Sequence, residues 1–228
     1  MTFIESLLAA ERPVIMEVKR KDAHGNDLLG TRSVAELVAE YEAAGAPCLS
    51  VVTGRWFGGT EDTLREVAQL TDLPLLQKDF ITRQSQLLKA RELGASAVLL
   101  TAALLPASSL AKLVDQSLVL GLTPFVEVTN EAEVTSVPVA DQCVIAVNNK
   151  DIKVQERDAG DIDRSLTMLA TVLGTGTRCP VSASGIENPA VAGQLLDAGF
   201  AGLLVGTALL RSGRVQDWMA ELSVQARR

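Results

Sequence analysis

The sequence of 228 residues predicts a (β/α)8 barrel, the TIM-barrel fold, from two observations. First, eight short apolar runs rich in β-branched residues recur along the chain. Their starts lie roughly 20 to 35 residues apart, which is the length of one strand–helix unit. Second, helical patterns with capping residues lie between these runs. Runs that are apolar throughout are typical of parallel strands covered on both faces, so the sequence predicts a closed parallel sheet inside a ring of helices.

The eight runs define the expected strands of the barrel. They are Val14–Val18, Cys48–Val52, Leu73–Gln77, Ala97–Thr101, Pro124–Val128, Val144–Val147, Cys179–Ser182 and Gly202–Val205.

The expected helices are marked by residues that begin and end helices. The segment Ser33–Ala44 opens with Ser33 and has Glu36 three residues later, a capping box, and Gly45 follows it. The segment Asn188–Ala198 opens with Asn-Pro and is followed by glycine, the usual asymmetry of helix ends. The other expected helices are Thr60–Leu70, Thr82–Leu93, Ser108–Leu120 and Asp163–Leu173.

A doubly wound open sheet is the alternative fold. It is disfavoured because no glycine-rich dinucleotide fingerprint follows the first strand. No linker-like segment divides the chain, so residues 1–228 are expected to form a single barrel domain.

Composition and charge exclude several classes of function. Acidic residues outnumber basic ones by 28 to 21, and the resulting net charge of −7 argues against nucleic acid or an anionic membrane as the main partner. Residues 1–12 contain no secretory signal, and the cysteines Cys48, Cys143 and Cys179 are expected to be buried thiols of a cytoplasmic protein. A single histidine argues against a zinc site or a Ser-His-Asp site, so no metal is expected.

Charged side chains mark the carboxyl ends of the expected strands, where barrel enzymes carry their chemistry. Glu17 and Glu127 are set in apolar runs, and a buried carboxylate is costly unless it is paired. Lys19, at the end of the first expected strand, and Lys78, at the end of the third, supply candidate partners. Lysine and glutamate facing each other in a partly dry cleft provide a general acid and a general base. Structural ion pairing in the barrel mouth is the alternative interpretation.

Two glycine motifs follow the last two strands, Ser-Gly-Ile at Ser184–Ile186 and Val-Gly-Thr at Val205–Thr207. In many barrels these loops present backbone N–H groups to a phosphate, so we expect a phosphate site here. After the second strand, Phe57 either covers an aromatic substrate or packs on the barrel rim. Ser50, Phe57 and Lys150 are the other residues that we expect to contact the substrate.

These residues give the chain a resemblance to the indole-3-glycerol phosphate synthase family, from about Pro13 to Gly213. Lys-Asp-Phe-Ile after the third strand, together with Asn-Asn after the sixth, is specific to this family among phosphate-binding barrels. The segments that carry the resemblance are Glu17–Lys19, Cys48–Thr53, Lys78–Ile81, Val126–Val128, Val147–Asp151, Ser182–Ile186 and Leu204–Leu209.

The resemblance implies a carbon–carbon lyase of tryptophan-type biosynthesis that needs no cofactor. Its substrate would be carboxyphenylamino-deoxyribulose phosphate, which undergoes ring closure with loss of carbon dioxide and then water. Carried over by position, Lys78 resembles the general acid at the ketone oxygen, and Glu127 resembles its partner in dehydration. Lys19 resembles the lysine near the substrate carboxylate. The remaining carried-over residues are Glu17, which holds the lysines, Asn148 as a polar contact, and Ser184, Gly185, Gly206 and Thr207 as the phosphate cradle.

Four features depart from the family pattern. Ala183 stands where the family has glutamate, and Lys150 stands where it has arginine. The segment Lys21–Asn26 replaces the family's Ser-Pro-Ser-Lys/Arg-Gly loop. Because the first strand begins near residue 14, most of the helical extension that covers the barrel mouth in this family is expected to be missing.

Three interpretations of function stay open at this stage. The first is an indole-3-glycerol phosphate synthase-type carboxy-lyase that acts on the usual substrate or a close analogue. The second is a paralogue of specialised metabolism that catalyses a related cyclisation on another phosphorylated substrate. The third is a non-catalytic barrel that binds a phosphate ligand or a partner. A homodimer or a partner enzyme that covers the barrel mouth is a further hypothesis.

Overall fold

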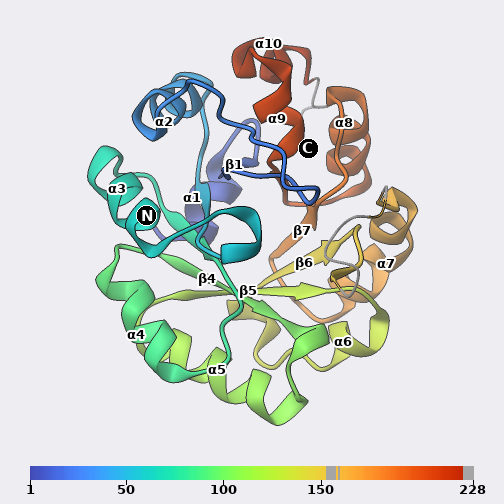
Figure 1. Ribbon diagram of the computed structural model, residues 1–228. Helices are drawn as coiled ribbons and strands as arrows, with labels where there is room; N and C mark the ends of the chain where they lie inside the picture. Colours follow the sequence, from blue (N-terminus) through green and yellow to red (C-terminus); the bar gives the residue numbers. More distant parts are fainter. Residues whose placement is uncertain (153–157, 159, 223–228) are drawn as a thin grey trace.

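The computed structural model, which describes residues 1–152, 158 and 160–222, contains a closed barrel of eight parallel strands in chain order (Figure 1). The strands are β1 Val14–Val18, β2 Leu49–Val52, β3 Leu75–Lys78, β4 Ala97–Thr101, β5 Thr123–Val128, β6 Val144–Asn148, β7 Cys179–Ala183 and β8 Gly202–Val205. The predicted (β/α)8 barrel is confirmed.

Helices surround the barrel and follow the predicted order (Figure 1). Ser33 and Glu36 form the predicted capping box, and the Asn188 side chain accepts a hydrogen bond from the Val191 N–H. The helices are α2 Val34–Ala43, α3 Glu61–Leu70, α4 Gln84–Glu92, α5 Ala107–Val119, α6 Glu131–Thr135, α7 Ile162–Gly174, α8 Pro189–Ala198, α9 Thr207–Ser212 and α10 Val215–Glu221, with short 3-10 turns η1 Arg55–Phe57, η2 Ala102–Leu104 and η3 Ala140–Gln142.

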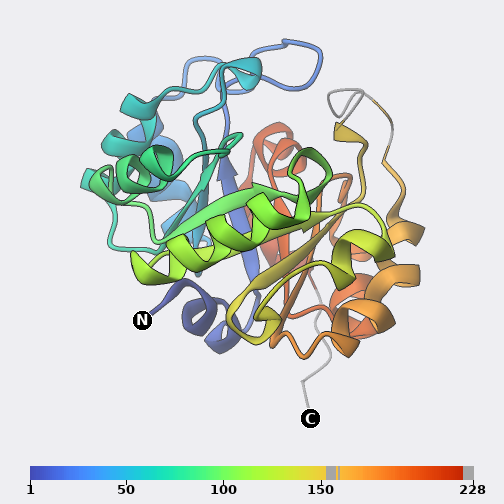
Figure 2. The ribbon, with the colours of Figure 1, turned by 90° about the horizontal axis from the view of Figure 1, so that it is seen from below.

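Helix α1, Phe3–Ala9, lies at the end of the barrel opposite the loops that follow the strands (Figure 2). The Phe3 ring packs edge-on against Phe125 inside the barrel, at a centroid distance of 6.2 Å. Leu7 occupies the space beside Gly202, where a Cβ would lie 2.7 Å from the Leu7 Cδ2. The N-terminal residues therefore close the bottom of the barrel rather than cover its mouth.

The strand register places four interior positions in one layer near the mouth. Barrel strands tilt, so a hydrogen-bonded neighbour is displaced by about one residue per strand along the axis, and alternate strands share a layer. Glu17 pairs with Ser50, which pairs with Leu76, so Lys78 lies at the height of Glu17. The same pairing, followed through β4 and β6, places Glu127 of β5 and Ala183 of β7 at this height as well. The layer consists of Glu17, Lys78, Glu127 and Ala183.

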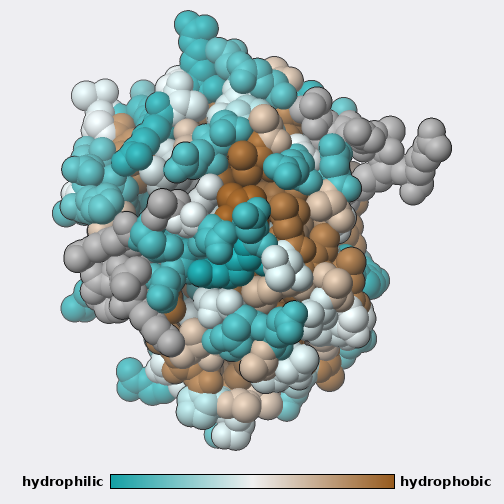
Figure 3. All heavy atoms as spheres, turned by 90° about the vertical axis from the view of Figure 1, so that its right-hand side faces the viewer, coloured by the Kyte–Doolittle hydropathy of each residue, from teal (hydrophilic) through white to brown (hydrophobic). Residues whose placement is uncertain are grey.

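None of the helices in the described part of the chain is both long and apolar enough to span a membrane. On the side that carries α7 and α8, hydrophilic side chains are interspersed with apolar patches (Figure 3).

Candidate active site

A cavity of about 710 Å³ opens at the mouth of the barrel. Its lining brings together eight of the residues predicted from the sequence, which are Glu17, Lys19, Lys78, Lys150, Ser184, Gly185, Gly206 and Thr207. The charged strand ends and the two glycine motifs therefore face a single space.

Glu17 holds both lysines of the mouth. Its carboxylate, in a side chain that is 2% exposed, lies 3.0 Å from Lys19 Nζ and 3.1 Å from Lys78 Nζ. Burial alone would raise the pKa of Glu17, but the two ammonium groups outweigh it and lower the pKa to about 2. A Cβ at Gly206 would collide with Glu17 Oε1, so the glycine of β8 leaves the room that the carboxylate occupies.

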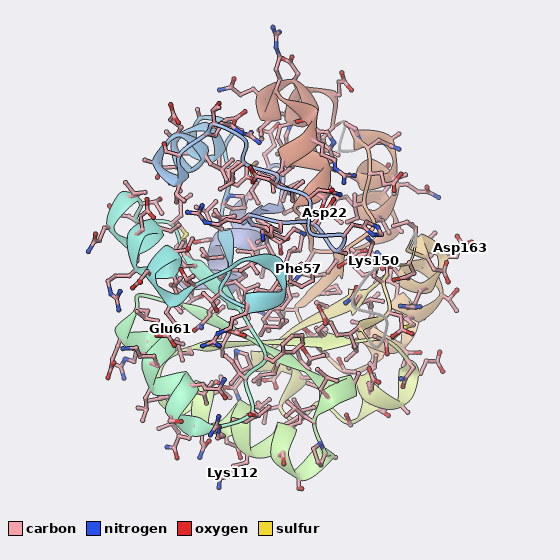
Figure 4. All side chains as sticks on the ribbon, viewed as in Figure 1. Asp22, Phe57, Glu61, Lys112, Lys150 and Asp163 are labelled. Carbon is pink, nitrogen blue, oxygen red and sulfur yellow. The ribbon has the colours of Figure 1, made fainter. Side chains whose placement is uncertain are left out.

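Phe57 contacts Lys19 rather than lining the cavity. The Lys19 ammonium lies 5.4 Å from the centroid of the Phe57 ring, within the range of a cation–π interaction. In Figure 4, Phe57, Asp22 and Lys150 lie around the mouth, whereas Glu61, Lys112 and Asp163 lie at the periphery. This geometry favours the interpretation that Phe57 packs on the rim.

Three other predicted residues are buried close to the cavity without lining it. Glu127 lies one residue before the end of β5, in the same layer as Lys78. Asn148 ends β6 opposite Ala183, and its side-chain oxygen accepts a hydrogen bond from the Lys150 N–H at 2.9 Å. Ser50 faces the barrel interior, and its hydroxyl has no hydrogen-bond partner among the described residues.

The turn after β7 is strained and is held by a buried hydrogen-bond network. Ser184 has φ +66° and Gly185 has φ +70°, and the left-handed conformation costs a residue other than glycine roughly 1–2 kcal/mol. Asn149 Nδ2 donates to the Ser184 carbonyl at 2.9 Å and to Ser182 Oγ at 3.0 Å. The Ser165 hydroxyl of α7 donates to Asn149 Oδ1 at 2.6 Å. Sequence reasoning did not assign roles to Asn149 or Ser165, although Asn149 belongs to the Asn-Asn motif.

The loop that follows β1 is organised by Asp22, which sequence reasoning also missed. Its Oδ1 accepts hydrogen bonds from the N–H groups of His24 and Asn26, and its Oδ2 accepts from Asn26 Nδ2 and from Arg211 Nη2 at 2.6 Å. Burial would raise the pKa of Asp22, but these hydrogen bonds and the Arg211 charge lower it to about 2. The available signal was local, because the run Asp-Ala-His-Gly-Asn at residues 22–26 is typical of a turn capped by an aspartate side chain.

The family model described as indole-3-glycerol phosphate synthase matches residues 1–222. The chain belongs to this family. A synthase from Exiguobacterium is 36% identical over 203 residues, covering 87% of this chain and 76% of the relative. The synthase of Pyrococcus furiosus is 36% identical over 208 residues, covering 90% of this chain and 88% of the relative. A longer relative, the tryptophan biosynthesis protein TrpCD of Archaeoglobus fulgidus, is 34% identical over 225 residues, which cover 95% of this chain and 39% of that protein.

A solved structure supports the fold independently. A chain from the tryptophan synthase α2β2 complex of Pyrococcus furiosus superposes with a TM-score of 0.65 at 13% identity, covering 92% of this chain and 96% of that chain. Ala183, one of the departures from the synthase family pattern, occupies the fourth position of the layer that holds Glu17, Lys78 and Glu127.

Proposed function

We propose that the protein is an indole-3-glycerol phosphate synthase that closes the indole ring of carboxyphenylamino-deoxyribulose phosphate. The observation that carries this proposal is the shared cavity: the Glu17–Lys78 ion pair and the two glycine motifs line one space of about 710 Å³. A substrate with a reacting ketone at one end and a phosphate at the other fits that arrangement.

Lys78 serves as the general acid in this mechanism. The ring carbon that bears the carboxylate forms a bond with the ketone carbon, and the ketone oxygen takes a proton from the Lys78 ammonium. Glu17 is ionised at neutral pH because its pKa is about 2, and its carboxylate lies 3.1 Å from Lys78 Nζ, where it holds the ammonium group in place. Carbon dioxide then leaves, and the bonding electrons that it leaves behind restore the ring.

Dehydration completes the reaction. The hydroxyl formed from the ketone leaves as water after protonation, and a proton is lost from the new ring. Glu127 is the carboxylate that we assign to this proton transfer, because it shares the layer of Lys78. Lys19 lies at the mouth above Glu17 and is assigned to the substrate carboxylate.

The phosphate is assigned to the turn after β7 and to the start of α9. Ser184, Gly185, Gly206 and Thr207 all line the cavity. Ser184 and Gly185 follow the last residue of β7 and are both left-handed. Backbone N–H groups in such turns donate hydrogen bonds to phosphate oxygens in many proteins. Lys150 lines the same cavity and adds a cation.

The test is a fluorescence assay of indole-glycerol phosphate formation from carboxyphenylamino-deoxyribulose phosphate. We expect turnover by the unsubstituted protein, loss of at least 100-fold with Lys78→Ala, and unchanged turnover with Lys112→Ala, which removes an exposed lysine of α5. Absence of turnover by the unsubstituted protein, with folding intact, would refute the proposal.

Ala183 favours a second candidate, a cyclisation of the same type on a different phosphorylated substrate. The layer of Glu17, Lys78 and Glu127 lacks the carboxylate that the family pattern places on β7. Restoring it with Ala183→Glu separates the candidates. A sharp rise in indole-glycerol phosphate formation would mean that the natural chain has moved away from that reaction, and a fall would support the first proposal.

A further inference from the structure

The four residues assigned to the phosphate, Ser184, Gly185, Gly206 and Thr207, carry no full positive charge. Backbone N–H groups provide only partial charges, whereas a phosphate carries nearly two negative charges. Among the described residues from β7 onward that line the cavity, the one cationic side chain is Arg211. Glu187, which lines the same region, is negatively charged.

Arg211 is placed to meet a ligand at Thr207. The two residues are four apart on α9, so they lie on the same face of the helix, one turn from each other. The side chain of Arg211 is 59% exposed, and it contacts Asp22 through Nη2. A guanidinium has five donors in a planar fork, so one edge on Asp22 leaves another edge for a phosphate oxygen.

Asp22 fixes the orientation of this arginine. Its carboxylate is 5% exposed and is held by three donors of its own loop, so it is a rigid acceptor. The same connection is anchored a second time, because Arg32 Nη2 donates to the Leu210 carbonyl at 2.9 Å. The segment between β1 and α2 is thus fastened to α9 at two adjacent residues, Leu210 and Arg211.

We propose that Arg211 is a further phosphate-binding residue of this site and that Asp22 is the positioning residue that holds its guanidinium toward the cavity. The inference rests on the proposed function for the location of the phosphate. It also gives the altered loop after β1 a role, because Asp22 belongs to the segment that departs from the family pattern.

The first experiment is calorimetric titration of the full chain with inorganic phosphate at constant ionic strength. We expect Arg211→Gln to weaken binding roughly 10- to 100-fold, the usual effect of losing a charge-assisted hydrogen bond, and Arg211→Lys to recover part of the loss. Arg214→Gln is the matched control, because it removes a 79% exposed arginine that also pairs with an aspartate but does not line the cavity. Equal phosphate affinity of Arg211→Gln and the unsubstituted protein would overturn the assignment, as would a lack of phosphate binding by the unsubstituted protein.

A double-mutant cycle tests the positioning role. Asp22→Asn is expected to weaken phosphate binding several-fold in the natural background and to have no effect in Arg211→Gln, because it acts through the arginine. Tighter binding in both backgrounds would show that Asp22 merely repels phosphate, and would overturn this role.

Measurements of turnover and of phosphate binding together distinguish a failure of this inference from a failure of the proposed function. If the substrate is not converted but phosphate binding depends on Arg211, the reaction assignment fails and the phosphate assignment stands. If the substrate is converted and neither phosphate affinity nor KM changes in Arg211→Gln, the reaction assignment stands and this inference fails. If the reaction assignment and the phosphate assignment are both correct, Arg211→Gln raises KM far more than it lowers kcat.

Discussion

The substitution Glu17→Gln tests whether one carboxylate holds the charged mouth of the barrel together. Glutamine has nearly the same shape, so the space beside Gly206 stays filled and the change is mainly electrostatic. Lys19 loses the carboxylate 3.0 Å away, and Lys78 loses one of its contacts. A carboxyl pKa lowered from 4.5 to about 2 corresponds to roughly 3 kcal/mol, and removing one partner of a buried ion pair typically costs 3–5 kcal/mol.

The assay is thermal unfolding at pH 7. For a chain of this size about 1 kcal/mol lowers the melting temperature by roughly 2–4 °C, so we expect a fall of roughly 6–12 °C. The control is Glu92→Gln, which breaks an exposed pair with Lys89 at 3.5 Å and should change stability by less than about 0.5 kcal/mol. If Glu17→Gln melts within 2 °C or so of the unsubstituted protein, the ion pairs of Glu17 do not stabilise the mouth.

Three further predictions follow from the structure. Asn149→Ala removes the hydrogen bonds that hold the strained Ser184, and should lower stability by about 2–3 kcal/mol and raise KM; denaturant unfolding and steady-state kinetics check both. Glu17 and Asp22 have pKa values of about 2 in the folded state, so their stabilisation is complete above about pH 4.5 and is lost as the pH falls toward 2, visible as a falling melting temperature over that window. Leu7→Ala should lower the free energy of unfolding by about 2–5 kcal/mol, because it opens a void at the bottom of the barrel. KM should stay unchanged, because α1 lies at the end of the barrel opposite the mouth. A change in KM equal to that of Asn149→Ala would contradict this prediction.

The barrel was predictable because its strands are buried on both faces and its helices carry their own start and stop signals. The signals fail where an element is too short to show a period. Helix α6 has only five residues, so it shows no helical period, although its Asn130 cap stands three residues before Glu133 in the sequence. The third strand begins two residues later than expected, because Pro74 has no N–H for the ladder and precedes the first residue of the strand.

The site was predictable in part for a chemical reason. A glutamate inside an apolar run must find a cation, and the strand-end lysines were the available ones, so Glu17, Lys19 and Lys78 could be grouped from the sequence. Asp22 and Arg211 are 189 positions apart, and nothing local in either segment indicates the other. Their pairing depends on barrel closure, which brings β1 beside β8.

Ala183 also has a meaning that only the closed barrel supplies. The layer and the lysine above it contain two carboxyl groups, Glu17 and Glu127, and two amino groups, Lys19 and Lys78, which balance in formal charge. A third carboxyl at position 183, where the side chain is 1% exposed, would add an uncompensated buried negative charge. Burial and like charges both raise a carboxyl pKa. At pH 8, Ala183→Glu should therefore have a lower melting temperature than the unsubstituted protein. At pH 5 the difference in melting temperature should be smaller, because the new carboxyl can be protonated. A pH-independent change would instead indicate steric crowding, and equal stability at both values would mean that a neighbouring cation, such as Lys150, turns to neutralise the new group. Either outcome would show that the charge balance of the layer is not the reason why alanine occupies position 183.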